Sequence, residues 1–450
     1  MTARTRKIIA LLFLLGFVLT APLVILTTKG YRYNWKKGRL EKTGILVLDS
    51  LPTEADIYLN GSLYRKKTPT SLFRMLPESY AIRLQKTGYL PWQKVLPIKS
   101  GETTFTQEVI LFQDVVPQLL EAGDFTAAAF DPTGRRAALL RRGDEWLELV
   151  IYDRRTAVTS VLDRFSPDKY ASPELSWSPD GGRLLFQAKV AGGERELLIY
   201  TAGGAETGAL PVNLPPEGWR KAAWSDDGTA LIILSDRGLF TAAPDGGDPI
   251  TVILSPRIQD AAAVGRNAYL LETEADKVVL ERMNLDGRGL PETVADLPAG
   301  KYSVSDANER YLLLTDAGGA SRLIDRQNGR IAATVNARHA AWEKTPGEGR
   351  LLLWNDFELY VLDPAAGTPQ LITRLGTALT GAAWHVSGRD VIYGTADSVS
   401  AIELDDRDQR NAFELARLTG IRGFLADPST ATLLLIGSAG NSKGIFERGL

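Results

Sequence analysis

The feature that most constrains this chain is a stretch that recurs along it with an average spacing of 42 residues. Its clearest copy, LSWSPDGGRLLF at residues 175–186, places an aromatic residue before a turn cluster and a run of strand-forming residues. Eight copies align on one aromatic or valine residue, here called the anchor: Phe130, Trp177, Trp224, Val264, Val304, Trp342, Trp384 and Phe424. A period near 40 residues with several short strands per repeat predicts a β-propeller, whose blades are four-stranded sheets.

Each segment of the repeat predicts one strand of a blade. We expect the anchor to end the innermost strand and to pack between blades, while Pro, Asp and Gly form the turn into the second strand. Continuous apolar runs follow the turn, as expected for second strands that are covered on both faces. Third strands are expected in segments such as LELVIYD and GLFTA, and fourth strands in segments such as PQLITRL.

The number of repeats predicts eight blades, with seven as the alternative if Val264 or Val304 marks an insertion. The last repeat stops at Leu450, too soon for a fourth strand. The segment VVPQLLEAG, residues 115–123, precedes the first repeat and is expected to supply that strand. Pairing the two ends of the propeller would close the ring and remove exposed sheet edges.

These repeats resemble the TolB-like propeller family with its W-S-P-D-G signature. The likeness is clearest at residues 177–181 and 224–228, it fades at Val264 and Val304, and it covers roughly residues 115–450. The resemblance implies the fold but carries almost no information about activity, because many unrelated functions share one fold.

An uncharged run of 21 residues, Ile8 to Thr28, follows a short basic tail at residues 1–7. At about 1.5 Å per residue, a helix of this length reaches across the hydrocarbon core of a bilayer. We therefore predict a single-pass membrane anchor, with a cleaved signal peptide as the alternative. Basic residues on both sides of the run leave the topology open. The positive charges after it favour a cytoplasmic body, whereas signal-anchors with basic residues ahead of them commonly leave the body outside.

Residues 44–112 form a second β module. Strands are expected on both sides of Pro52, and Asn60-Gly61 suits a type I′ hairpin turn. The segment resembles a PEGA domain, a small β-sandwich-like module of bacterial and archaeal envelope proteins. The resemblance is carried by Pro52, Ala55, Asn60-Gly61, Thr68-Pro69, Leu76-Pro77, Tyr80, Gly88-Tyr89 and Trp92. Two positions depart from it, since Glu54 and Ser79 replace the usual glycines and put turns of positive φ in doubt. The family pattern defines no catalytic group.

The fold class is therefore all-β: an N-terminal transmembrane helix, a small PEGA-like β-sandwich and a propeller. The expected divisions are a basic tail (1–7), the anchor (8–28), a basic membrane-proximal linker (29–43), the PEGA-like domain (44–114) and the propeller (115–450).

The side-by-side Ser178 and Asp180 raise the question of a catalytic site. We interpret them as turn residues, because a turn repeated around a ring is scaffold. At the position of Ser178, other copies of the repeat carry Asp131, Glu343 or His385. Residue types this different could not serve as the same catalytic group. No G-x-S-x-G elbow with a following hydrolase domain is present. No catalytic residue is therefore predicted.

Binding sites for metals and cofactors are not predicted either. The chain has no cysteine and two histidines, His339 and His385, which we expect to be packed or solvated rather than to bind a metal. The glycine-rich stretch 437–444 lies between expected strands and does not open a helix, so it is not read as a phosphate loop. The pairs Asp226-Asp227 and Asp405-Asp406 could bind Ca²⁺, but solvated turn carboxylates are the favoured interpretation.

Basic and acidic residues are distributed unevenly along the chain. Residues 1–114 hold 17 Lys/Arg and 8 Asp/Glu, which leaves 35 against 46 for the remainder. An acidic body argues against nucleic-acid binding, and a basic head suggests an anionic surface nearby.

Three functions remain open at this point. The favoured one is a non-catalytic, membrane-anchored envelope protein whose propeller lies outside the cytoplasm and binds a protein or a cell-wall glycan. The alternatives are a sensor or assembly subunit facing the cytoplasm, and an enzyme with an unrecognised site in the propeller channel.

Overall fold

The computed structural model describes residues 3–190, 192–202, 208–215, 218–245, 247–343, 349–427 and 431–450. The chain divides into two compact units. The first comprises Met1–Val115 with Ile402–Phe413, and the second comprises Val116–Ala401 with Glu414–Leu450. Each unit is described below on its own.

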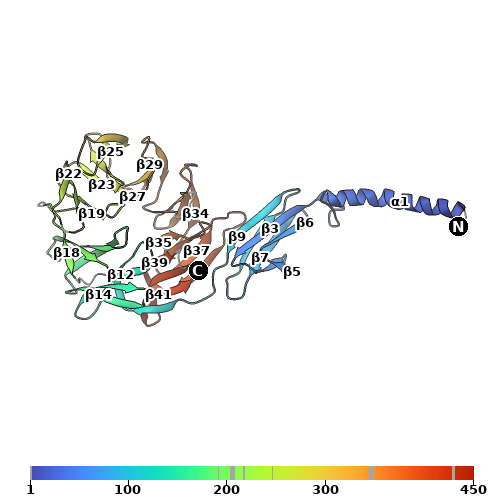
Figure 1. Ribbon diagram of the computed structural model, residues 1–450, viewed down its shortest axis with the longest axis horizontal. Helices are drawn as coiled ribbons and strands as arrows, with labels where there is room; N and C mark the ends of the chain where they lie inside the picture. Colours follow the sequence, from blue (N-terminus) through green and yellow to red (C-terminus); the bar gives the residue numbers. More distant parts are fainter. Residues whose placement is uncertain are drawn as a thin grey trace. The chain divides into compact units, whose positions relative to one another are not determined.

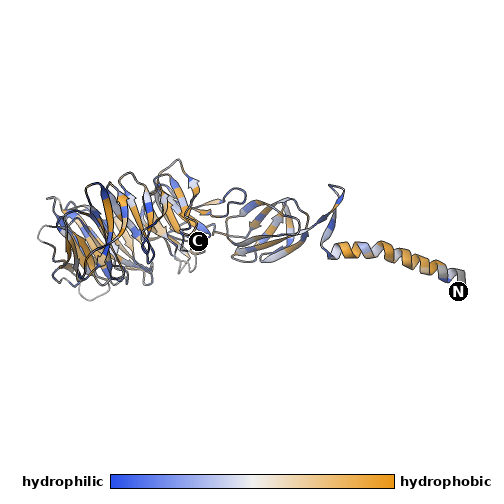
Figure 2. Cartoon of the chain, turned by 90° about the horizontal axis from the view of Figure 1, so that it is seen from above, coloured by the Kyte–Doolittle hydropathy of each residue, from blue (hydrophilic) through white to orange (hydrophobic). Residues whose placement is uncertain are grey.

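The first unit begins with the apolar run, which lies in one helix, α1 (Ala3–Thr28), that continues through Pro22. Most of this helix is coloured as hydrophobic in Figure 2. Within the described ranges, α1 alone is long and apolar enough to cross a membrane. Gly30, with a φ of +84°, ends the helix. The basic segment that we expected as a linker then folds into a two-stranded hairpin of β1 (Tyr31–Asn34) and β2 (Arg39–Lys42).

Two sheets form the β module that follows. Their strand orders are β6-β3-β9 and β5-β4-β7-β8. The strands are β3 (Gly44–Leu51), β4 (Asp56–Leu59), β5 (Ser62–Lys67), β6 (Thr70–Met75), β7 (Ser79–Gln85), β8 (Trp92–Pro97) and β9 (Thr103–Ile110). Asn60 and Gly61 both have positive φ, +48° and +83°, and Leu59 pairs with Ser62 across the turn. This geometry agrees with the predicted type I′ hairpin.

A segment from late in the chain belongs to this first unit. Lys94 on β8 is fully buried, and its ammonium group forms an ion pair with Glu403. It also donates to the backbone oxygen of Asp405 at 2.8 Å. The Trp92 indole N–H donates to the other carboxylate oxygen of Glu403, at 2.8 Å, and the Asn411 side chain donates to the first, at 2.9 Å. Every group of this buried charge pair therefore has a partner, as burial requires.

The second unit consists of sheets arranged in a ring, with the first strand of each sheet toward the centre (Figure 1). Within its described residues there are eight four-stranded sheets, the number that the repeats favour. In chain order, the strands of the first four sheets are β11 (Asp124–Phe130), β12 (Arg136–Arg142), β13 (Leu147–Asp153) and β14 (Val158–Phe165); β15 (Tyr170–Trp177), β16 (Arg183–Val190), β17 (Arg195–Thr201) and β18 (Ala209–Pro211); β19 (Lys221–Trp224), β20 (Leu231–Leu234), β21 (Gly238–Ala242) and β22 (Ile250–Leu254); β23 (Ile258–Val264), β24 (Asn267–Thr273), β25 (Lys277–Asn284) and β26 (Glu292–Pro298).

The remaining sheets complete the ring. Their strands are β27 (Tyr302–Ala307), β28 (Tyr311–Asp316), β29 (Ser321–Asp325) and β30 (Ile331–Val335); β31 (His339–Trp342), β32 (Leu351–Trp354), β33 (Glu358–Leu362) and β34 (Pro369–Arg374); β35 (Leu379–Trp384), β36 (Asp390–Thr395), β37 (Ser398–Glu403) and β38 (Ala412–Arg417); and β39 (Thr419–Asp427), β40 (Thr432–Ala439), β41 (Ser442–Gly449) and β10 (Gln118–Ala122). As expected, β10 comes from the segment 115–123 and pairs with β41, so the last sheet joins the two ends of the propeller sequence.

Most anchors occupy the predicted position at the end of an innermost strand. Three tryptophans also bridge neighbouring sheets, each donating its indole N–H to a backbone oxygen of the preceding innermost strand. The bonds join Trp177 to Ala129 at 2.9 Å, Trp224 to Ser176 at 3.2 Å and Trp384 to Ala341 at 2.9 Å. The second strands are almost entirely buried, which agrees with their apolar composition.

The expected anchor position is wrong for two repeats. Val304 lies inside β27, which runs on to Ala307, and Phe424 lies inside β39, which runs on to Asp427. In the first case the turn contains no Pro-Asp-Gly. Asn308 forms the turn instead, its side-chain oxygen accepting the backbone N–H groups of Arg310 and Tyr311 at 2.9 and 2.7 Å. The strand therefore continues past the residue that aligned with the tryptophans.

Candidate functional site

The hydrogen bonds of Ser178 and Asp180 lie within the β15–β16 turn. The Ser178 hydroxyl donates to the Asp180 carboxylate at 2.5 Å and accepts the Arg183 backbone N–H at 2.9 Å. The Gly182 N–H also donates to the Asp180 carboxylate. The Ser178 hydroxyl, followed by this N–H, holds the pKa of Asp180 below its usual range. Both side chains thus act on the backbone of their own turn.

The next sheet repeats this arrangement. Ser225 donates to Asp227 at 2.7 Å and accepts the Ala230 N–H at 3.0 Å. Gly181 and Gly228 occupy the same place in the two turns with φ of +68° and +70°, a conformation that favours glycine. Recurrence of the whole set supports a structural role for Ser178 and Asp180.

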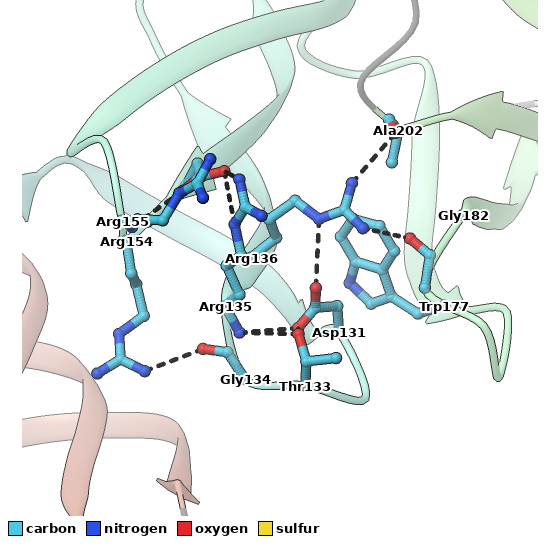
Figure 3. Close-up of polar contacts among 12 residues, drawn as sticks. Asp131, Thr133, Gly134, Arg135, Arg136, Arg154, Arg155, Trp177, Gly182 and Ala202 are labelled. Atoms are coloured by element: carbon cyan, nitrogen blue, oxygen red, sulfur yellow. Dashed lines mark hydrogen bonds and ion pairs between the residues drawn. The ribbon is translucent and has the colours of Figure 1, made fainter. Parts of the chain in front are cut away.

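In the first sheet, Asp131 accepts the Thr133 hydroxyl at 3.0 Å and the Arg135 backbone N–H at 2.9 Å within its turn, and it also contacts an arginine. Figure 3 shows Arg136 between Asp131 and the following sheet. Its Nε donates to the Asp131 carboxylate at 3.2 Å, and its Nη1 donates to the backbone oxygen of Ala202 at 3.1 Å. The guanidinium also lies 5.1 Å from the centre of the Trp177 ring. Asp131 therefore positions an arginine that joins two neighbouring sheets.

Glu343 has the same role later in the ring. Arg350 donates to both Glu343 carboxylate oxygens, at 2.7 and 2.8 Å, and to the backbone oxygen of Gly388 in the next sheet. It lies 5.0 Å from the centre of the Trp384 ring. The acidic residues at this position of the repeat are accordingly explained by contacts between sheets.

Both histidines lie where the sequence places them. His339 is the first residue of β31, and its ring stacks on Trp354 with 5.5 Å between centroids. His385 follows β35 in the turn, is buried, and its Nδ1 lies 2.8 Å from the Ser387 hydroxyl. Burial lowers the pKa of His385 to about 4, so the ring is neutral near pH 7. Among the residues that the structure describes, no group of three or more His, Asp or Glu side chains could hold a metal ion.

The other sequence candidates also have structural contacts. Asp226 accepts the Gly265 backbone N–H at 2.7 Å, while Asp227 belongs to its turn. Asp405 pairs with Arg407 at 2.7 Å, and Asp406 lies 3.8 Å from Arg410. The glycine-rich residues 437–444 form the end of β40, its turn and the start of β41, as expected for a connection between strands.

A pocket that the sequence did not reveal lies on the innermost strands of three consecutive sheets. Its volume is about 360 Å³. The lining residues are Lys221, Ala223, Trp224, Asp226, Ile232, Leu234, Ala261, Ala262, Ala263, Val304, Ser305, Asp306 and Ala307. Small side chains on β23, with Ala223 on β19 and Ala307 at the end of β27, line this space.

Charges in the pocket are only partly balanced. Lys221 contacts both carboxylate oxygens of Asp260, at 2.8 and 2.9 Å, so its charge is compensated. Asp306 accepts the adjacent Ala307 N–H at 2.7 Å. Among the described residues, no Lys, Arg or His forms an ion pair with Asp306. Burial raises the pKa of this carboxyl, and the hydrogen bond from Ala307 opposes that rise.

A β-bulge places Asp306 in the pocket. The register of β27 against β28 shifts between Val304 and Asp306, so Ser305 is the extra residue. Bulges re-aim the side chains beside them and are frequent next to binding sites. An uncompensated carboxyl in a concave site is a functional candidate, because folding alone does not favour it.

Comparison with known proteins identifies the first β module. Residues 43–110 match the PEGA domain family. The second unit is similar in structure to propellers. The C-terminal WD40 domain of Sif2 aligns with a TM-score of 0.52 and 13% identity, covering 74% of this chain and 98% of that one. The Dos1 propeller aligns with a TM-score of 0.50 and 16% identity, covering 74% and 94%. A comparison with curated proteins found no match.

The PEGA motif residues form contacts within the domain. Thr68 is buried, and its hydroxyl accepts the Ala55 N–H at 3.0 Å and lies 2.6 Å from the Ser50 hydroxyl. Glu54, one of the two departures from the family pattern, retains a positive φ of +63°, whereas Ser79 begins β7. The PEGA domain thus keeps the Glu54 turn without glycine.

Proposed function

We propose that this chain is a non-catalytic, membrane-anchored scaffold whose propeller binds a partner protein by taking a cationic side chain into the pocket at Asp306. The propeller fold is typical of protein-binding scaffolds. The observation that carries the proposal is the uncompensated Asp306 carboxyl on the innermost strands.

The chemistry of the pocket favours a lysine or an arginine of the partner. The walls are mainly alanine, isoleucine, leucine and valine, which suit an aliphatic stem, and Asp306 offers a carboxylate to its charged end. The excess of acidic residues in 115–450 would attract such a partner over longer distances. A glycan remains the second class of partner from the sequence, but the lining has one aromatic side chain, Trp224, on which a sugar could stack.

Catalysis is not part of the proposal. Ser178, Asp180 and their counterparts are engaged in turns, and the buried His385 is neutral near pH 7, with its Nδ1 beside Ser387. The Ser387 hydroxyl accepts the backbone N–H of Arg389 at 3.1 Å, so this pair of side chains also belongs to its own turn. The W-S-P-D-G repeats favour a TolB-like relationship within the propeller class.

The anchor in this proposal is α1, with the body outside the cytoplasm. Its length and apolar surface suit a membrane span, and a PEGA domain follows it as in envelope proteins. The basic residues after α1 favour the opposite topology, a cytoplasmic sensor or assembly subunit. Protease accessibility of the propeller in intact cells distinguishes these two locations.

Thermal unfolding of the purified full chain in detergent tests the pocket. The probes are Nα-acetyl-lysine amide and the uncharged Nα-acetyl-norleucine amide, which share an aliphatic stem. We expect the lysine probe to raise Tm with increasing concentration and the norleucine probe to have little effect, because binding to the folded state stabilises it.

Matched variants make this test specific. Asp306→Asn should abolish the shift caused by the lysine probe, whereas Asp276→Asn, the same change at an exposed residue between β24 and β25, should preserve it. Equal shifts with both probes, or a full lysine-dependent shift in Asp306→Asn, would contradict a cationic ligand at Asp306.

A further inference from the structure

The hairpin of β1 and β2 has two chemically different faces. Tyr33 pairs directly with Leu40, and Tyr31 with Lys42, so these four residues share one side. Arg32 pairs with Glu41 and Asn34 with Arg39, which places those four on the other side. The hairpin is therefore amphipathic across its thickness.

The polar side is satisfied within the protein. Glu41 is buried and accepts hydrogen bonds from the Asn34 amide and the Arg39 guanidinium, both at 2.8 Å. On the same side, Arg32 donates to the backbone oxygen of Arg74 in the PEGA domain at 3.3 Å. This side is thus turned toward the PEGA domain.

Among the residues that the structure describes, none covers the opposite side to a comparable extent. Leu40 is 47% exposed and Tyr33 is 41% exposed, while Trp35, at the tip of the hairpin, is 87% exposed. The Tyr33 and Trp35 rings contact each other edge to face, with centroids 4.7 Å apart. Lysines flank this group: Lys36 and Lys37 follow Trp35 at the tip, and Lys42 lies at the base. Tyrosine, tryptophan and lysine are the residues that anchor proteins at a membrane–water interface.

The base of the hairpin is fixed to the end of α1. The Gly30 carbonyl, which follows the helix, accepts both the backbone N–H and the hydroxyl of Thr43, at 2.8 and 2.7 Å. The hairpin therefore begins and ends beside the last turn of the apolar helix. When α1 spans a bilayer, this position is at the level of the lipid headgroups.

We propose that the aromatic face of the hairpin, formed by Tyr31, Tyr33, Trp35 and Leu40, lies on the bilayer interface with its lysines among anionic headgroups. The inference rests on α1 being the anchor of the proposed function. It assigns the hairpin a second contact with the membrane, which would hold the PEGA domain next to the lipid surface through Arg32 and Arg74.

Site-specific fluorescence tests this contact, because a chain without cysteine accepts a single label. Leu40→Cys carries an environment-sensitive NBD dye on the aromatic face. Leu371→Cys on β34 of the propeller is the control, since Leu371 is 44% exposed and thus matches Leu40. Both labelled full-length chains are inserted into vesicles of phosphatidylcholine and phosphatidylglycerol.

We expect NBD at position 40 to emit at shorter wavelength than at position 371. It should be quenched several-fold more by lipids carrying a nitroxide near the headgroup, and less by aqueous iodide. Equal iodide quenching at both positions would overturn the inference. Flotation of the vesicles after alkaline carbonate treatment tests α1 separately. A chain that floats with an iodide-accessible position 40 refutes the hairpin contact alone, whereas a chain that does not float refutes the anchor and, with it, the contact.

Discussion

At the scale of single residues, Asp306 is a side chain whose surroundings do little to stabilise its charge. Its carboxyl sits in a pocket lined mainly by apolar groups, with one backbone hydrogen bond and no ion pair among the described residues. Side chains that lower the stability of the folded protein are frequent in functional sites. The stability of the folded chain can therefore report on this residue before any partner is known.

We predict that Asp306→Asn raises the free energy of unfolding at pH 7 by about 1 kcal/mol, the usual scale of a single stabilising substitution. Burial raises the pKa of Asp306 in the folded chain above its value in the unfolded chain. Between these two pKa values the folded chain binds more protons than the unfolded chain, so its stability falls as pH rises. The advantage of the variant should therefore shrink as pH falls toward 3.9, the ordinary pKa of Asp. Urea unfolding of the variant and the wild type at several pH values measures this difference in stability. A variant less stable than the wild type at pH 7 would contradict the account of this carboxyl.

The tryptophan anchors allow a matched comparison between two residues. Trp384 donates its indole N–H to Ala341 at 2.9 Å, whereas the buried indole nitrogen of Trp342 has no hydrogen-bond partner in the described part of the chain. Trp384→Phe should therefore destabilise the chain by about 1 kcal/mol more than Trp342→Phe, because both changes remove the same ring but only one breaks a hydrogen bond. Thermal unfolding gives both values. Equal losses would show that the bonds between sheets contribute no stability.

At the scale of strands and sheets, closure of the propeller depends on the close approach of β41 to β10. Gly444 on β41 pairs with Ala122, and a Cβ atom at Gly444 would lie 2.1 Å from the Glu121 backbone oxygen. No side chain fits there without displacing the closing strand. A single methyl group at this position can therefore test whether β10 holds the ring together.

We predict that Gly444→Ala destabilises the propeller by about 1–3 kcal/mol, the usual cost of overpacking. Gly423→Ala is the control, because Gly423 lies on β39 of the same sheet and an added Cβ would meet no atom within 4 Å. Urea unfolding of both full-length variants compares them. If Gly444→Ala is as stable as Gly423→Ala, then β10 does not close the ring in solution.

The sequence predicts local structure well in this chain, because turns and strands depend on neighbouring residues. The Asn60-Gly61 hairpin and the turn after Trp177 were accessible in this way. The pairing of 115–123 with the last repeat was predicted from the repeat pattern, because the last repeat ends too soon for a fourth strand. Other contacts between distant segments were not accessible. Nothing local indicates that Lys94 pairs with Glu403, 309 residues later, or that basic residues after α1 form a hairpin. The pocket was missed for a related reason, since its key carboxyl depends on a bulge in a repeat whose pattern is weak.

At the scale of the whole molecule, charge differs between the two ends of the chain. Residues 1–114 hold 17 Lys/Arg against 8 Asp/Glu, and the remaining residues hold 35 against 46. Near an anionic membrane, each exposed basic residue contributes about 1 kcal/mol to attraction, while acidic residues are repelled. With α1 as the proposed anchor, this charge distribution would draw the basic residues of the first unit toward the lipid and leave the acidic propeller available to the proposed partner.

Protease accessibility of the propeller in intact cells tests the central claim, that an anchored chain presents this propeller outside the cytoplasm. Protease is added to cells whose outer layers have been made permeable while the inner membrane stays sealed, and antibodies to the propeller and to a cytoplasmic protein follow the digestion. The account predicts that the propeller is degraded while the cytoplasmic protein survives, and that the undigested chain is recovered with the membranes. A propeller that stays intact under these conditions, or a full-length chain recovered in the soluble fraction without detergent, would contradict it.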